Sequence, residues 1–332
     1  MKNRALILTI TFLIVIGLVF TITNSKKESL SNSSKESVVL ASTFPIFQIV
    51  RNVVNGSNEV KAELMLPSQM GCPHDYVLTP QDMRKLATAD VLVINGLGME
   101  EFLGAPLKKA NAKLQLIDSS RDITDLLKYN GAGGCSGCSG CSSCDPTSCE
   151  TDQHADEKFS TINPHLWVSP RLVKKLAKNI AEDLSKIYPK SRELFLNNAD
   201  KFSKKLTVLI EEFETLNDKL ANNRIIQTQG IFDYLARDAG LQIVGIMQHY
   251  GQEPSAAELI ELVKIIENTK AGAIFSQPQY SDKVARTLAK QTGIKIIKLD
   301  PLATGPDSAP IDYYESTMRQ NIEIIKEALG KK

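Results

Sequence analysis

Short apolar runs alternate with amphipathic segments along most of the chain. The runs lie at residues 38–41, 60–66, 91–94 and 114–117 in the first half, and at 224–227, 241–246, 273–275 and 294–299 in the second. Segments with helical spacing of apolar positions, such as 256–267 and 281–292, separate them. This alternation is typical of βα units around a parallel sheet. We therefore predict an α/β protein with two sheets of about four strands each, flanked by helices.

Two strong helical patterns lie between the halves. Ser169 and Pro170 form an N-cap followed by proline at the first helical position, and Pro189 ends this segment. From Phe195 to Leu220, apolar residues recur every three or four positions, which is helical periodicity. We interpret residues 190–221 as a long rigid helix that joins an N-terminal lobe, 38–189, to a C-terminal lobe, 222–332. An ordinary surface helix of one lobe is the alternative.

The first residues have the composition of an export signal. A basic start at residues 1–4 precedes an apolar run at 5–22 and a polar stretch. The run has no A-x-A cleavage pattern and no following cysteine, and it is about long enough to cross a bilayer. We expect residues 1–24 to anchor an exported protein in the cytoplasmic membrane, with a cleaved signal as the alternative, and residues 25–37 to form a linker.

Composition and motifs exclude several functions. The chain has 332 residues, 42% of them hydrophobic and 23% charged, as expected of a soluble globular part. A net charge of +1 provides no basic field for nucleic acid. The chain contains no phosphate-binding loop of the G-x4-G-K-[ST] type and no supported nucleophile arrangement. We therefore predict a binding protein and not an enzyme.

Two of the four histidines have matching contexts. His74 and His165 each follow a proline in an expected loop, and proline restricts the backbone that presents the imidazole. Asp300 follows the strand at 294–299, at the edge where α/β sheets bind ligands, although a turn cap is its commoner role. Neutral imidazole is a favoured zinc ligand. Each histidine alone is more often structural, but the pair indicates a metal site.

Residues 131–157 form a Gly/Ser-rich segment that cannot build a core. Its cysteines are Cys135, Cys138, Cys141, Cys144 and Cys149. They can form an auxiliary loop that captures zinc or another thiophilic metal. Disulfides are the second interpretation, because exported chains meet an oxidising compartment. An iron–sulfur site is the third, although the segment lacks the C-x3-C-P ending of a ferredoxin.

Several stretches match one family in order along the chain. They are Ser-Thr-Phe-Pro at 42–45, Pro-His-Asp-Tyr at 73–76, Asn-Gly-Leu-Gly at 95–98, Asn-Pro-His-Leu-Trp at 163–167, Glu-Pro-Ser at 253–255 and Asp-Pro-Leu at 300–302. The chain resembles the cluster A-I (cluster 9) substrate-binding proteins of zinc and manganese ABC importers. The resemblance implies a monomer of two lobes with a metal between them, which serves a separate ABC permease and its ATPase.

The resemblance also implies a ligand set. By position, His74 and His165 are ligands from the first lobe, and Asp300 is the carboxylate from the second. Gln229 stands where the family usually has His in zinc proteins or Glu in manganese proteins, and Gln277 stands where Glu is expected. A glutamine amide is a weaker zinc ligand than imidazole, and it adds no charge for manganese or iron.

The fourth ligand therefore stays open among the Gln229 amide oxygen, a water, His249 and Cys72. Zinc is the predicted cargo, with manganese or iron as the alternative. Two other functions also remain open. One is a redox or iron–sulfur protein that uses the cysteine segment, and the other is an adhesin or metal chaperone with the same fold.

Overall fold

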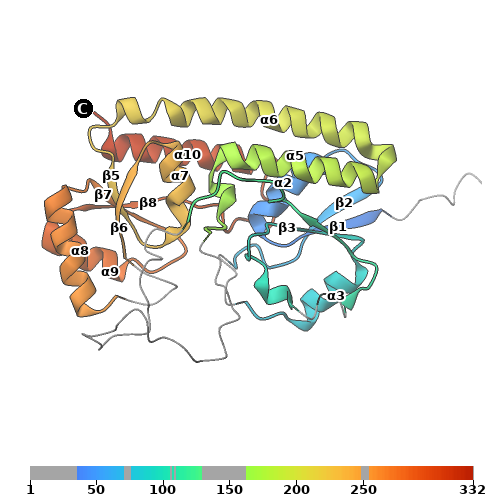
Figure 1. The fold of residues 1–332 in the computed structure, drawn as a ribbon, viewed down its shortest axis with the longest axis horizontal. Helices are drawn as coiled ribbons and strands as arrows, with labels where there is room; N and C mark the ends of the chain where they lie inside the picture. Colours follow the sequence, from blue (N-terminus) through green and yellow to red (C-terminus); the bar gives the residue numbers. More distant parts are fainter. Residues whose placement is uncertain are drawn as a thin grey trace, which may run out of the picture. The chain divides into compact units, whose positions relative to one another are not determined.

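The computed structural model describes residues 36–70, 76–128 except 105, 106, 108 and 109, then 162–247 and 254–331 (Figure 1). Residues 38–332 form a compact unit by themselves. No helix among the described residues is long and apolar enough to cross a membrane. The predicted anchor at 1–24 and nearly all of the predicted linker at 25–37 lie outside the described residues, as does the cysteine segment.

The described strands form two sheets with the same strand pattern. The first has the order β2-β1-β3-β4 and the second β6-β5-β7-β8. The pairs β1–β3, β3–β4, β5–β6, β5–β7 and β7–β8 run parallel. Their bounds are β1 (Ser37–Ala41), β2 (Val60–Leu64), β3 (Val91–Ile94), β4 (Gln115–Asp118), β5 (Arg224–Gln227), β6 (Gln242–Ile246), β7 (Ala273–Ser276) and β8 (Lys295–Lys298). The prediction of two four-stranded parallel sheets is confirmed.

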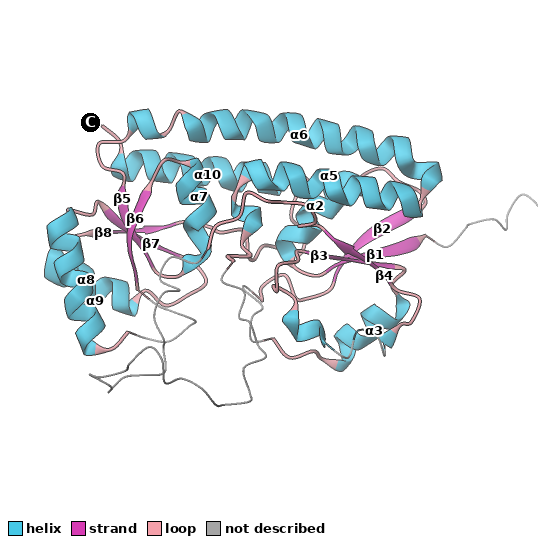
Figure 2. Cartoon of the chain, in the orientation of Figure 1, coloured by secondary structure: helices cyan, strands magenta, loops and turns pink. Residues whose placement is uncertain are grey.

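Helices flank both sheets (Figure 2). The α-helices are α2 (Phe44–Val54), α3 (Pro80–Thr88), α5 (Pro170–Ile187), α6 (Arg192–Glu214), α7 (Asp233–Asp238), α8 (Ala256–Thr269), α9 (Lys283–Thr292) and α10 (Tyr313–Leu329). Short 3-10 helices lie at η1 (Glu101–Leu103), η2 (Leu166–Val168), η3 (Pro189–Ser191), η4 (Asn217–Lys219) and η5 (Gly230–Phe232). As expected, the Ser169 hydroxyl accepts from the Leu172 N–H and caps α5.

One hydrophobic core links the two lobes. A continuous buried cluster includes Val93 of the first sheet, Leu176 of α5, Phe202 of α6 and Phe275 of the second sheet. The helix α6 contacts α2 on the first lobe and α10 on the second. Because side chains in such a core interdigitate at crystal-like density, the two lobes resist rotation about α6. This packing is the physical reason to expect α6 to act as a rigid connection between the lobes.

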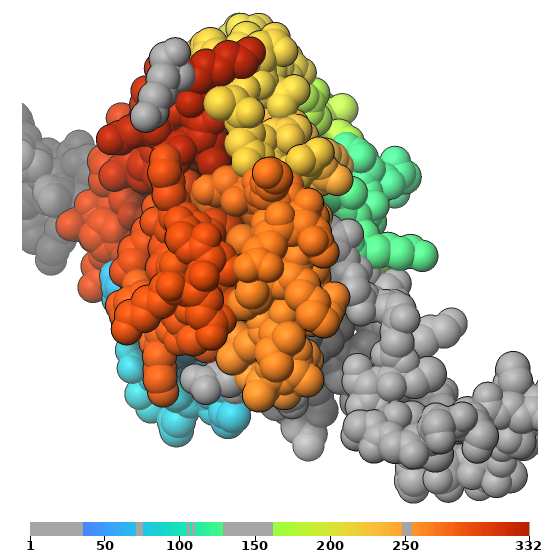
Figure 3. All heavy atoms as spheres, turned by 90° about the vertical axis from the view of Figure 1, so that its left-hand side faces the viewer, coloured from blue at the N-terminus to red at the C-terminus, as the bar shows by residue number. Residues whose placement is uncertain are grey.

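Each sheet also has its own smaller core on the opposite face. In the first lobe, Leu40 and Leu92 pack against Leu86 of α3. In the second, Ile226 and Ile274 pack against Leu262 of α8 and Leu288 of α9. The space-filling view in Figure 3 looks onto the covering helices of the second lobe, in orange. Both sheets are thus covered on both faces, which leaves their strand ends as the places for polar chemistry.

Candidate metal centre

The carboxyl edge of the second sheet carries three polar residues in a row. The neighbouring strands β5, β7 and β8 run parallel, and the register pairs Gln227 with Phe275 and Ser276 with Lys298. Gln229 and Gln277 therefore follow their strands at the same level, and Asp300 follows β8 one position further along. Parallel strands end at a common edge. Residues that are distant in sequence are in this way brought to one place.

His165 is held in a defined orientation. It is 5% exposed, and the Asn163 side-chain oxygen accepts from both the His165 backbone N–H, at 3.0 Å, and ring Nδ1, at 2.7 Å. The Asn163 amide nitrogen donates to the Gly230 carbonyl, at 2.6 Å, and to the Asp233 carboxylate, at 2.9 Å.

This network decides the tautomer of His165. Both Gly230 and Asp233 offer only oxygen acceptors to the Asn163 amide, so its nitrogen must face them and its oxygen must face His165. Nδ1 of His165 then has to be the protonated ring nitrogen, and the lone pair lies on Nε2. A histidine that donates through one nitrogen and coordinates through the other is the usual arrangement at metal sites.

The loop that carries His165 is tied to the second sheet on both sides. Gly230, which Asn163 binds, directly follows Gln229. Trp167 Nε1 donates to the Pro301 carbonyl at 2.8 Å, and Pro301 directly follows Asp300. The Trp167 ring also meets the His165 ring edge to face, with centroids 5.1 Å apart. His165 is thus placed between the chain segments that carry Gln229 and Asp300.

Asp300 is a partly buried carboxylate with a partly structural role. One of its side-chain oxygens accepts from the Leu302 N–H at 2.7 Å, and Leu302 has a left-handed φ of 58°. The Asn321 amide exchanges hydrogen bonds with the Asp300 backbone on both sides. Burial raises the pKa of Asp300, and the Leu302 bond opposes this only in part. A cation bound here would offset the loss of hydration of the carboxylate.

Gln229 accepts a hydrogen bond from another glutamine. The Gln277 amide nitrogen donates to the Gln229 side-chain oxygen at 3.0 Å, and Gln279 donates to the Gln277 oxygen at 2.9 Å. Gln277 is 1% exposed. The two glutamines that depart from the family pattern are thus direct partners, a relation that their separate places in the sequence did not reveal.

Glu100 was missed by the sequence analysis. Its carboxylate accepts from the Ser42 hydroxyl at 2.7 Å and from the backbone N–H groups of Asn95, at 2.7 Å, and Gly96, at 3.0 Å. The Asn95 amide in turn donates to the carbonyl of Pro164, the residue before His165, at 2.9 Å. The signal was present in Asn-Gly-Leu-Gly at 95–98, where Gly96 and Gly98 have φ values of 89° and 82°.

Burial raises the pKa of Glu100 to about 7, against an ordinary value of 4.5, although its hydrogen bonds oppose the shift. The folded protein therefore holds a proton that the unfolded chain has lost, and stability should decrease as pH rises from about 4.5 to about 7. In Glu100→Gln, the decrease in unfolding free energy between about pH 5 and about pH 8 should be smaller by about 2 to 3 kcal/mol.

Urea unfolding at both pH values measures this difference. The matched control is Glu101→Gln, because Glu101 is the exposed neighbouring carboxylate. An equal pH slope in the wild type and in Glu100→Gln would rule out Glu100 as the source of the pH dependence. The test compares how the unfolding free energy changes with pH and not its absolute value. Glutamine has one side-chain oxygen for the three groups that donate to Glu100, so Glu100→Gln is expected to be less stable at any pH.

The other predicted ligands lie outside the described residues. They are His74, His249, Cys72 and the cysteines at 135, 138, 141, 144 and 149. Within the described part of the chain, no three His, Cys, Asp or Glu side chains lie close enough to hold a metal by themselves. His165, Asp300 and Gln229 therefore represent only part of the predicted ligand set, and the full set stays a prediction.

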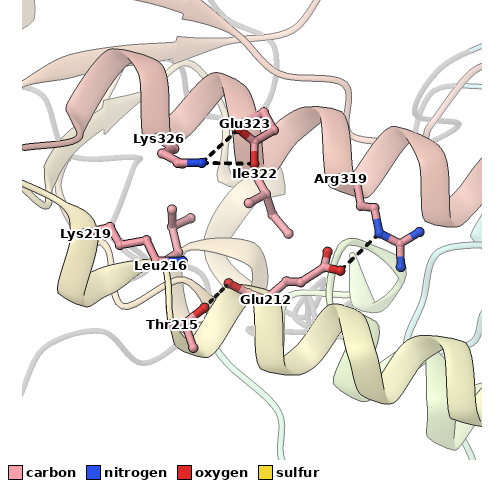
Figure 4. A pocket seen from close by; sticks show the side chains of 8 residues that line it. All are labelled: Glu212, Thr215, Leu216, Lys219, Arg319, Ile322, Glu323 and Lys326. Carbon is pink, nitrogen blue, oxygen red and sulfur yellow. Dashed lines mark hydrogen bonds and ion pairs between the residues drawn. The ribbon is translucent and has the colours of Figure 1, made fainter.

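A separate cavity lies between the end of α6 and α10 (Figure 4). It has a volume of about 230 Å³ and contains none of the predicted ligands. Four of its five charged side chains are paired with one another, Arg319 with Glu212 and Lys326 with Glu323, both at 3.1 Å. Such partly exposed pairs are worth little energy, and they give no sign of a ligand.

The architecture is that of a two-lobed solute-binding protein. The family model for the zinc-uptake complex component A, periplasmic, matches residues 39–328, and the chain belongs to this family. The predicted resemblance is therefore confirmed for the zinc type.

Similar proteins extend this result. The zinc-binding protein AdcA of Streptococcus pyogenes serotype M1 is 28% identical over 292 residues, which is 87% of this chain and 55% of that protein. The chain thus spans about half the length of this relative. The high-affinity zinc uptake system protein ZnuA of Bacillus subtilis (strain 168) is 27% identical over 312 residues, 92% of each chain. A crystal structure of ZnuA has a TM-score of 0.72 at 28% identity, covering 89% of this chain and 100% of that one.

Proposed function

We propose that the protein is the extracytoplasmic solute-binding component of an ABC importer, which captures zinc and delivers it to the permease. The observation that carries the proposal is the orientation of His165. Its Nδ1 contacts the Asn163 side-chain oxygen, and its loop is hydrogen-bonded to Gly230 and Pro301, the residues that follow Gln229 and Asp300. Zinc is preferred to manganese and iron because the relative of comparable length, from Bacillus subtilis, is named for zinc uptake. The family match also favours transport over a redox function.

Zinc itself is the cargo in this scheme. His165 would bind the zinc ion through Nε2. Asp300 would supply a negatively charged carboxylate that is partly desolvated by burial. His74 would complete the set from the first lobe, with the fourth position filled by Gln229, His249, Cys72 or water. The chain would act as a monomer and catalyse no reaction. Residues 1–24 would hold it at the outer side of the cytoplasmic membrane.

The shared core limits how the site can open. Rotation of one lobe would disrupt packing between α5, α6 and both sheets. It would also break the Trp167–Pro301 and Asn163–Asp233 hydrogen bonds, which connect the two lobes. Uptake and release should therefore involve local loop movement more than hinge motion of whole lobes.

Equilibrium dialysis with elemental analysis tests the proposed cargo. The purified metal-free protein is exposed to Zn²⁺, Mn²⁺ and Fe²⁺, both separately and in competition. We expect one zinc ion per chain to be retained after extensive dialysis when the segment 135–149 is deleted, and manganese and iron to be displaced by zinc. Retention of manganese in preference to zinc would contradict the proposed cargo. Visible charge-transfer absorbance after anaerobic purification would instead support the iron–sulfur alternative.

A further inference from the structure

The glutamines at the carboxyl edge of the second sheet form a hydrogen-bonded chain of neutral amides. Gln279 donates to Gln277, and Gln277 donates to the oxygen of Gln229. Gln277 is almost completely buried, so loss of either hydrogen bond would leave a buried polar atom of its amide without a partner, which is energetically costly. Gln229 is the member next to the proposed metal site, because the Gly230 carbonyl that follows it accepts from Asn163, which also contacts His165.

A chain of amides can run in either direction. Each amide has a donor end and an acceptor end of nearly the same shape, so turning all three about their terminal bonds keeps both hydrogen bonds. In the observed direction, the Gln229 oxygen faces Gln277. In the reverse direction, the Gln229 nitrogen would donate to Gln277, and the oxygen would face the metal site. Both directions keep the two hydrogen bonds, so their energies are close enough for a bound cation to reverse them, although the observed direction is the one adopted without a cation.

We propose that Gln277 is a positioning residue that decides which end of the Gln229 amide faces the metal. This inference rests on the proposed function and deepens it. A bound cation attracts the Gln229 amide oxygen and so favours the reverse direction. The amides of Gln277 and Gln279 then have to turn as well, because each must keep its hydrogen bond to its neighbour. The site thereby has an oxygen ligand that is available only when a cation is present.

This arrangement also shapes selectivity. The Gln229 oxygen is neutral, so it adds no charge that would favour hard cations such as manganese. Reversal of three amides consumes part of the binding energy, and only a cation already held well by imidazole and carboxylate can induce it. The amide chain would thus disfavour weakly held ions, while a zinc ion bound to His165 and Asp300 would overcome the difference.

Glutamate at position 277 provides the test, because a carboxylate can only accept hydrogen bonds. In Gln277→Glu, the Gln229 nitrogen must donate to position 277, so its oxygen faces the metal before the cation arrives. We expect zinc to bind roughly tenfold more tightly. The added negative charge could produce the same change directly, so a second variant is needed to separate the two causes.

A double-mutant cycle separates them. Zinc affinity is measured by competition with a chelating dye for the wild type, Gln277→Glu, Gln229→Leu and the double variant. If Gln277 acts through the Gln229 amide, the gain from Gln277→Glu should be lost in the Gln229→Leu background. A gain that persists there in full, or no gain in either background, would overturn the inference.

The controls keep this result apart from the proposed function. If the wild type fails to bind zinc in the same assay, the proposed function is wrong. Normal wild-type binding without coupling between positions 277 and 229 overturns only the role of Gln277. Thermal unfolding checks that each variant is folded. If Gln277→Glu does not fold, Gln279→Glu replaces it in the cycle, because Gln279 is exposed and would fix the same direction through Gln277.

Discussion

Replacement of His165 by alanine should weaken zinc binding by more than about 100-fold, the upper end of the loss seen when only an outer partner of a ligand is removed. The imidazole is buried, its tautomer is set by Asn163, and its loop is fixed to the second sheet. The site therefore loses a preorganised ligand that no flexible neighbour can replace. Chelator competition measures the affinity, and elemental analysis measures the retained zinc.

Deletion of residues 135–149 is the companion variant. If these cysteines only assist capture, the deletion should leave one tightly held zinc ion per chain. The two variants distinguish a main site at His165 from a main site in the cysteine segment, because each variant removes only one of them. Full zinc retention in His165→Ala, together with complete loss in the deletion, would place the main site in the cysteine segment and would refute the centre proposed here.

Replacement of Trp167 by alanine should lower the free energy of unfolding by about 4 kcal/mol, as for other large aromatic side chains removed from a core. The ring is 1% exposed. Its Nε1 donates to Pro301, and its carbonyl accepts from the Tyr314 hydroxyl at 2.9 Å. Alanine would leave a cavity and a Pro301 carbonyl without its donor, beside Asp300.

Chemical denaturation measures this loss, and Trp167→Phe is the matched control. Phenylalanine keeps most of the packing but cannot donate to Pro301, so its loss should be only about 1 to 2 kcal/mol. Zinc affinity should decrease in both variants, because the Trp167–Pro301 bond holds the His165 loop against the segment of Asp300. Less than about 1 kcal/mol of destabilisation in Trp167→Ala would show that this ring does not anchor the loop.

Much of the fold could be predicted because its signals are local. The apolar run at 91–94 became β3, one of the two inner strands of the first sheet, and Ser169 and Pro170 opened α5 as expected. The expected strand at 60–66 is shorter in the structure, where β2 ends at Leu64, although Met65 and Leu66 remain buried. The Met65 and Leu66 N–H groups still donate to Ala41 and Ser42, so the difference lies within the one or two residues by which assigned element ends vary.

The candidate site was predictable only in part. The contexts of His165 and Asp300 marked them as ligand candidates, and the structure places both on segments tied together through Trp167 and Pro301. The turn at 95–98 was recognisable, but it did not mark Glu100 itself, because an acidic residue after a Gly-rich turn is usually solvated. Its burial depends on Ser42, which is 58 positions away in the sequence.

The sequence by itself determined the two parallel sheets, the main helices, the family and the identity of the candidate ligands, because periodicity, caps and short motifs depend on neighbouring residues. Only the tertiary structure decided the tautomer of His165 and the pairing of Gln277 with Gln229. Asn163 meets Asp233 across 70 positions, and Gln277 meets Gln229 across 48. Such contacts depend on which strands become neighbours and in which register, and this information lies in the packing of the whole fold.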